Sequence, residues 1–141
     1  MAAAPSPGPF FRRESELVEL PDPRFQKAVS EFNQGEYFEA HEIWEELWKE
    51  TPFGELRRFY QGLIQVAAGY HKLHLPRGPH LRGARTLLSR GLEKLGRYPD
   101  YFFGVELDRL RRAVGEDLGK LQGVDPAGFS AELLRQPKIS Q

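Results

Sequence analysis

Histidine and glutamate residues that could do chemistry gather in one short stretch, Glu39 to Glu46. His41 and Glu45 are four residues apart, so on a helix both side chains point the same way. An imidazole and a carboxylate at this spacing can bind one metal ion or hydrogen-bond each other. Glu42 stands beside them as a candidate general base. The spacing therefore predicts a metal-binding or acid–base site centred on His41.

A second histidine can reach this stretch from the next predicted helix. Residues 36–50 and 55–75 each predict a helix, and the turn of about four residues between them favours antiparallel packing. His71 would then come close to His41, and two imidazoles with Glu45 can form a facial set for a divalent metal. The expected metal ligands are therefore His41, Glu45 and His71. The other expected pocket residues are Tyr37, Trp44, Gln61 and Gln65.

The same residues also have a purely structural explanation. A buried imidazole requires a hydrogen-bond partner, and Glu45 or His71 could supply one to His41. The His-Glu-x-x-His motif of metalloproteases is incomplete, because Glu45 occupies the position of its second histidine. Phe38 stands three residues before His41, so the Glu-x-x-His pattern of di-iron helices is also missing. The sequence leaves open whether the cluster is a site or a buried network.

Charge is distributed very unevenly along the chain. Residues 31–55 contain eight acids and one base, a net charge of −7, whereas residues 56–99 contain nine bases and one acid, a net charge of +8. The simplest interpretation is opposed charge on neighbouring solvated faces, and the alternative is one basic face that recruits an anion.

A basic segment from Lys72 to Arg85 is the second candidate site. Its Gly/Pro turn leads into a predicted helix start, where arginines and free backbone N–H groups can bind a phosphate or a carboxylate. The segment lacks the glycine-rich phosphate-loop motif, and its arginines could instead pair with the acidic helix of residues 36–50. The candidate anion ligands are Arg77, Arg82 and Arg85.

Helices are the elements expected to position these residues. Asp22-Pro23 is typical of a helix start, and Gly35 suits the left-handed position after a helix end. Residues 55–75 carry two adjacent apolar stripes, which predict a helix buried over much of its girth at the centre of the fold. Further helices are expected from near His80, over residues 105–121 and, shorter, over residues 130–135. No segment alternates as a strand requires, so the predicted class is all-α, a compact bundle of about five helices.

Two glycines in the helix expected from near His80 are Gly83 and Gly91. Glycine destabilises a helix interior but allows another backbone to come close. We therefore expect a neighbouring helix to approach at both positions.

Composition bounds the class of protein. The chain has 141 residues, 40% of them hydrophobic, which suffices for one core; we expect a poorly ordered arm over residues 1–21 and one helical domain over residues 22–141. Twenty Lys and Arg residues balance twenty Asp and Glu residues, so no net charge attracts nucleic acid or a membrane. The absence of cysteine excludes thiolate ligands. Without an apolar run of roughly 20 residues or a signal peptide, we expect a cytoplasmic protein.

Two sequence blocks carry a family resemblance. The first is Asn33-x-Gly35-x-Tyr37-Phe38-Glu39-Ala40-His41-Glu42-x-Trp44-Glu45-x-x-Trp48, and the second is Gln61-Gly62-Leu63-Ile64-Gln65-x-Ala67, continuing to His71. At this spacing they resemble domain-of-unknown-function family 309, a set of small helical bacterial and archaeal proteins. The resemblance covers about residues 25–121 and implies an all-α bundle without implying an activity. His80 departs from the family pattern, which usually has a helix-capping Asn there.

Three functions remain as expectations. The leading one is a His/Glu pocket between the helices of residues 36–50 and 55–75 that binds a divalent metal or a small ligand; an enzyme built on it would be a metal-assisted hydrolase or a related small-molecule enzyme. The second is a non-catalytic interaction or structural module whose cluster is a hydrogen-bond network. The third is binding of an anion or nucleic acid by the basic segment, although no nucleic-acid motif supports the latter. The sequence does not decide the cofactor, the partners or whether the chain forms a homo-oligomer.

Overall fold

Local signals set the ends of the first helix. The computed structural model describes residues 22–141, so the expected arm of residues 1–21 lies outside the described residues. Helix α2 spans Pro23–Asn33, and the Asp22 carboxylate accepts a hydrogen bond from the Arg24 N–H at 2.9 Å. Gly35 follows the helix with a φ of 83°, which a residue with a side chain adopts only at a cost. Both predicted ends are confirmed.

Four further α-helices lie in the described part of the chain: α3 (Tyr37–Glu50), α4 (Glu55–Leu73), α5 (Leu81–Leu95) and α6 (Leu107–Leu121). The predicted all-α class with about five helices is therefore confirmed. In place of the helix expected over residues 130–135, the chain forms the short 3-10 turns η1 (Pro126–Gly128) and η2 (Ala131–Leu133).

A minimal hairpin precedes α6, contrary to the prediction of no strand. Strands β1 (Tyr101–Phe102) and β2 (Val105–Glu106) pair antiparallel. The two residues that connect them, Phe103 and Gly104, have φ values of 51° and 78°, as two-residue hairpin loops require. Two-residue strands are too short to produce a recognisable alternation in the sequence.

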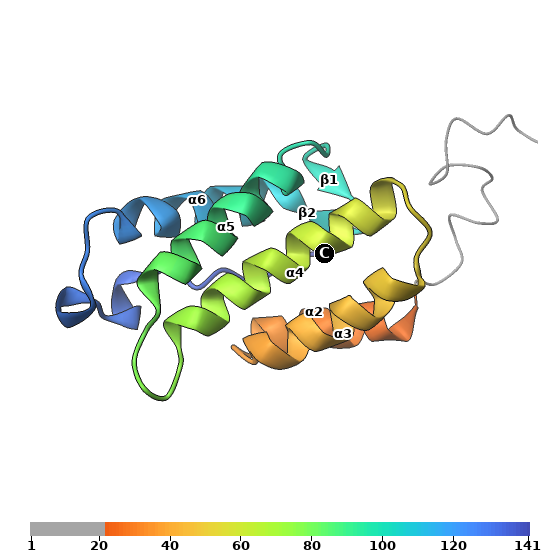
Figure 1. The fold of residues 1–141 in the computed structure, drawn as a ribbon. Coiled ribbons are helices and arrows are strands. Elements are labelled where there is room, and N and C mark those ends of the chain that lie inside the picture. The colour runs from red at the N-terminus through yellow and green to blue at the C-terminus, as the bar shows by residue number, and fades with distance from the viewer. Residues whose placement is uncertain (1–21) are drawn as a thin grey trace, which may run out of the picture.

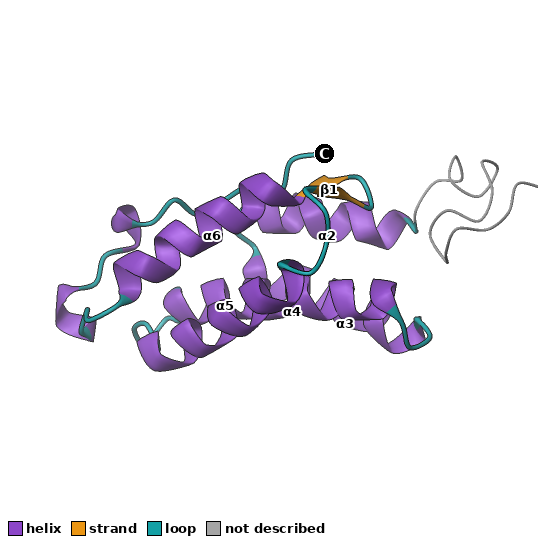
Figure 2. Cartoon of the chain, turned by 90° about the horizontal axis from the view of Figure 1, so that it is seen from above, coloured by secondary structure: helices purple, strands orange, loops and turns teal. Residues whose placement is uncertain are grey.

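The helices form two layers, with α3, α4 and α5 side by side in one layer and α2 and α6 in the other (Figures 1 and 2). Helix α4 lies between α3 and α5, as expected for the central helix, and most of the side chains on its inner face are buried. Its outer face is half-buried at Gln61, Ile64, Gln65 and Ala68. Within residues 22–141, none of the helices combines the length and apolarity needed to cross a membrane.

Glycine allows α4 and α5 to pack closely. A Cβ atom on Gly91 would lie 2.9 Å from the carbonyl oxygen of Gly62 and 2.8 Å from the Val66 side chain. The approach predicted at Gly91 is therefore confirmed. The prediction for Gly83 is wrong, because a Cβ atom there would meet the His80 imidazole rather than a neighbouring backbone.

His80 caps α5 despite its departure from the family pattern. Its Nδ1 atom accepts a hydrogen bond from the Gly83 N–H at 3.1 Å. The larger ring fits over the first turn because Gly83 has no side chain. The imidazole therefore serves as the N-cap of α5 in place of the asparagine that the family pattern usually has.

Asp117 holds the C-terminal segment against α4 and α6. It is fully buried, and no other charged residue of the described part is buried. Its carboxylate accepts hydrogen bonds from the Tyr70 hydroxyl at 2.6 Å and from the backbone N–H groups of Arg135 at 2.5 Å and Gln136 at 3.2 Å. Farther along, Asn33 exchanges two hydrogen bonds with the backbone of Ile139. The last residues of the chain are thereby tied to three helices.

We predict that Gly91→Ala destabilises the protein by about 2 kcal/mol, because the added methyl group strikes the α4 backbone, which cannot move without disturbing the core. Gly119→Ala is the matched control, since nothing lies within 4 Å of a Cβ atom at that helical position. It should stabilise the protein by roughly 0.5 kcal/mol through helix propensity alone. Urea unfolding measures both, and equal effects of the two substitutions would contradict close helix packing.

Candidate functional site

The start of α3 and the end of α4 border an open hollow of about 420 Å³. We call it the imidazole hollow; it is lined by Gly35, Glu36, Tyr37, Phe38, Glu39, His71, His74 and Pro76. Because α3 and α4 are antiparallel neighbours, residues more than thirty positions apart meet here.

The two predicted histidines, His41 and His71, lie against the same ring. Phe38 has its ring centroid 5.8 Å from that of His41 and 5.1 Å from that of His71. Burial lowers the pKa of His71 below its ordinary value of 6.5, and the nearby His41 lowers it further. His71 is therefore neutral at pH 7, and one of its ring nitrogens carries a free lone pair.

His74, which the sequence did not single out, also belongs to this hollow. Its Nδ1 atom lies 2.8 Å from the Tyr70 carbonyl oxygen, which can only accept a hydrogen bond. Nδ1 therefore carries a proton, which leaves Nε2 as the ring nitrogen available to a ligand. The available signal was the spacing of three residues from His71, which places both imidazoles on one side of a helix.

His41 has an unsatisfied polar atom. Its Nδ1 atom is buried and has no hydrogen-bond partner among the described residues, so the hydrogen bond expected from Glu45 or His71 is not made at this atom. Within residues 22–141, no three His, Asp or Glu side chains are placed to hold one metal ion, and the set His41, Glu45 and His71 is not gathered around one point. Glu42 is exposed on α3 and is not one of the residues that line the hollow.

The other expected pocket residues are separated by the fold. Tyr37 lines the imidazole hollow, whereas Trp44 is fully buried in the core. Gln61 precedes His71 by ten residues on α4, which is roughly 15 Å along the helix axis. Gln65 lies one turn from Gln61, and its buried Oε1 atom has no partner among the described residues.

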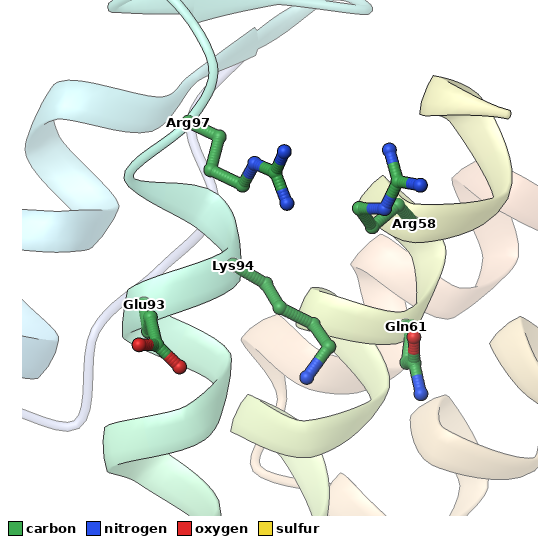
Figure 3. Close-up of a pocket in the computed structure, with 5 residues that line it drawn as sticks. All are labelled: Arg58, Gln61, Glu93, Lys94 and Arg97. Atoms are coloured by element: carbon green, nitrogen blue, oxygen red, sulfur yellow. The ribbon is translucent and has the colours of Figure 1, made fainter.

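Gln61 lines a second hollow, of about 440 Å³, between the first half of α4 and the end of α5 (Figure 3). We call it the basic hollow; its lining residues are Arg58, Gln61, Glu93, Lys94 and Arg97. The sequence did not single out its three cationic residues. The signal that could have done so is the net charge of +8 over residues 56–99, of which only the middle segment, Lys72 to Arg85, was considered as an anion site.

The candidate anion ligands of the α4–α5 connection take different positions. Arg77 and Arg82 are exposed, and Arg85 donates a hydrogen bond to the Leu121 carbonyl at 3.1 Å, which ties it to the end of α6. The expected alternative, pairing of these arginines with α3, is not found in the described part of the chain. The α3 acids Glu46 and Glu50 form ion pairs with Arg24 of α2 instead.

Residues 25–87 match the sequence model of the family described as "Domain of unknown function (DUF309)", which confirms the resemblance over that range. An uncharacterized protein of Aquifex aeolicus (strain VF5) is 32% identical over 107 residues, which are 76% of this chain and 29% of that protein. The uncharacterized protein YpuF of Bacillus subtilis (strain 168) is 39% identical over 61 residues, 43% of this chain and 33% of YpuF. The matched part thus spans about a third of the length of these relatives.

The lowered pKa of His71 makes stability depend on pH. Because the unfolded chain binds this proton more readily than the folded protein, the contribution of neutral His71 is complete above pH 6.5. It is lost as the pH falls from 6.5 through the folded pKa. We predict that the imidazole NMR resonance of His71 titrates with a midpoint below 6.5, and that His71→Gln reduces the loss of stability in this range. A midpoint at or above 6.5 would contradict the described environment.

Proposed function

We propose that the imidazole hollow binds a small cationic ligand. The residues that form it lie within the range 25–87, which matches the DUF309 family. The observation that carries this proposal is that the exposed ring of Phe38 and the neutral imidazole of His71 line one hollow. The carboxylates of Glu36 and Glu39 belong to the same lining. His41 contacts Phe38 but does not itself line the hollow.

The groups around the hollow offer lone pairs and negative charge. His71 is neutral, and the Nδ1 proton of His74 is directed at the Tyr70 carbonyl oxygen, away from the hollow's ligand. Glu36 and Glu39 contribute two exposed carboxylates to the lining. A cation or a hydrogen-bond donor is complementary to such a surface, whereas an anion is repelled.

Phe38 favours an aromatic amine among the cations. The residue is 42% exposed although its ring contacts the imidazoles of His41 and His71, so one part of the ring remains open to a ligand. A ring with an attached ammonium group can stack on Phe38 and direct its charge at the carboxylates. A divalent metal ion would find fewer than three protein ligands within the described residues and would keep water in its remaining positions. The function proposed is binding rather than catalysis, since Glu42 is exposed outside the lining.

Benzylamine is a suitable probe, with benzyl alcohol as its uncharged counterpart. We predict that benzylamine shifts the backbone amide resonances of Phe38, His71 and His74 in the full chain, and that His71→Asn raises its Kd about tenfold. His80→Asn is the matched control, because it removes a histidine outside the hollow and leaves a good helix cap. Zinc ion is titrated separately to distinguish a metal ion from an organic amine.

Three outcomes would refute cation binding in this hollow. In the first, benzyl alcohol causes the same shifts at the same concentrations, which leaves only apolar contact. In the second, His71→Asn and His80→Asn weaken benzylamine binding equally. In the third, neither benzylamine nor zinc ion produces saturable shifts.

The orphaned nitrogen of His41 gives an independent prediction. A buried polar atom without a partner costs roughly 1–3 kcal/mol, so His41→Leu should stabilise the protein by about 1 kcal/mol. Because His41 does not line the hollow, benzylamine should bind to this variant nearly as tightly as before. Chemical denaturation and the same NMR titration measure the two effects. Destabilisation by His41→Leu would assign His41 to a structural network instead.

A further inference from the structure

Three cationic side chains converge on the basic hollow. Arg58 comes from the first turns of α4, Lys94 from the last turn of α5, and Arg97 from the residues just after it. Figure 3 shows the Arg97 side chain extending across the hollow toward Arg58, while the Lys94 side chain reaches from α5 toward Gln61. Like charges repel, and an anion among these groups would interact favourably with all three.

Few carboxylates compensate this charge. Arg58 forms an ion pair with Glu55 at 3.1 Å, and Glu93 also lines the hollow. Neither Lys94 nor Arg97 forms an ion pair with any residue in the range 22–141. Two cations and the amide of Gln61 therefore remain available to a ligand.

We propose that the basic hollow binds a phosphate-type oxyanion of about the size of a diphosphate. Guanidinium groups donate paired hydrogen bonds that match the oxygens of a phosphoryl group, and an ammonium group adds a mobile point charge. The volume of about 440 Å³ exceeds what one phosphate group requires and lies in the ordinary range of small-ligand sites. This site is separate from the imidazole hollow and opposite to it in charge.

The surroundings indicate how a nucleotide phosphate would differ from a free one. One residue before Arg58 along α4, and outside the lining of the hollow, the guanidinium carbon of Arg57 lies 4.3 Å from the ring centroids of both Trp48 and Phe53. Phe53 is 91% exposed and offers a surface on which a base can stack. A nucleic-acid strand that extends beyond the hollow should therefore depend on Phe53, whereas a free diphosphate held inside the hollow should not.

Titration of the full chain with inorganic pyrophosphate at low ionic strength tests the site, monitored by the amide resonances of Gln61, Lys94 and Arg97. We expect saturable shifts and a Kd that Arg97→Gln raises about tenfold. Arg112→Gln is the matched control, because it removes the same charge from an exposed position on α6 in the other layer and should leave the Kd unchanged.

A uridine oligonucleotide distinguishes the two sources of the phosphate. If it binds more tightly than pyrophosphate, and both Arg97→Gln and Phe53→Ala weaken it, the phosphate belongs to a nucleic acid. If only Arg97→Gln matters and pyrophosphate binds as well as the oligonucleotide, the ligand is a free phosphate compound. Both results support the basic hollow.

Other results would overturn the site. Equal weakening by Arg97→Gln and Arg112→Gln would show nonspecific charge attraction. A loss of binding with Arg82→Gln but not with Arg97→Gln would place the anion at the α4–α5 connection. An absence of saturable binding would mean that the cations serve only solubility and the end of α5.

Discussion

The buried carboxylate of Asp117 is the interaction on which the other parts of this structure depend. A buried charge is tolerated only when its hydrogen-bonding capacity is filled, and here a hydroxyl from α4 and two backbone N–H groups fill it. Burial and the charge of Asp117 both raise the pKa of Tyr70, so its hydroxyl keeps the proton that it donates. One carboxylate thereby joins α4, α6 and the C-terminal segment.

Tyr70 connects the Asp117 carboxylate to the imidazole hollow. The Tyr70 ring stacks on that of Tyr37 at the start of α3, with centroids 5.3 Å apart, and its carbonyl oxygen fixes the proton of His74 on Nδ1. The side chain of Tyr70 is thus held in the core while its backbone sets the chemistry of a surface histidine. Helix α4 also contributes to the basic hollow at its other end, so its position between α3 and α5 determines both hollows.

Features encoded in neighbouring residues could be predicted from the sequence. The helix start at Asp22-Pro23, the reversal at Gly35 and the close approach at Gly91 follow from local chemistry, and the short turn after α3 was enough to bring His41 near His71. Features that depend on contacts between distant residues could not be predicted from the sequence. Asp117 stands 47 residues from Tyr70. Its spacing from Val114 and Leu121 places it on the buried face of α6, but nothing in the sequence identifies the partners of its carboxylate. The basic hollow arises only when the start of α4 meets the end of α5.

Amide hydrogen exchange in Asp117→Asn tests the role of this carboxylate most directly. An asparagine side chain offers one acceptor oxygen in place of two, so the hydroxyl and the two N–H groups can no longer all be satisfied. The described geometry predicts that the amides of Arg135 and Gln136 lose their protection, and that the His74 imidazole resonances shift, while the amides of α2 stay protected. Unchanged exchange at Arg135 and Gln136 would contradict the conclusion that Asp117 holds the C-terminal segment in place.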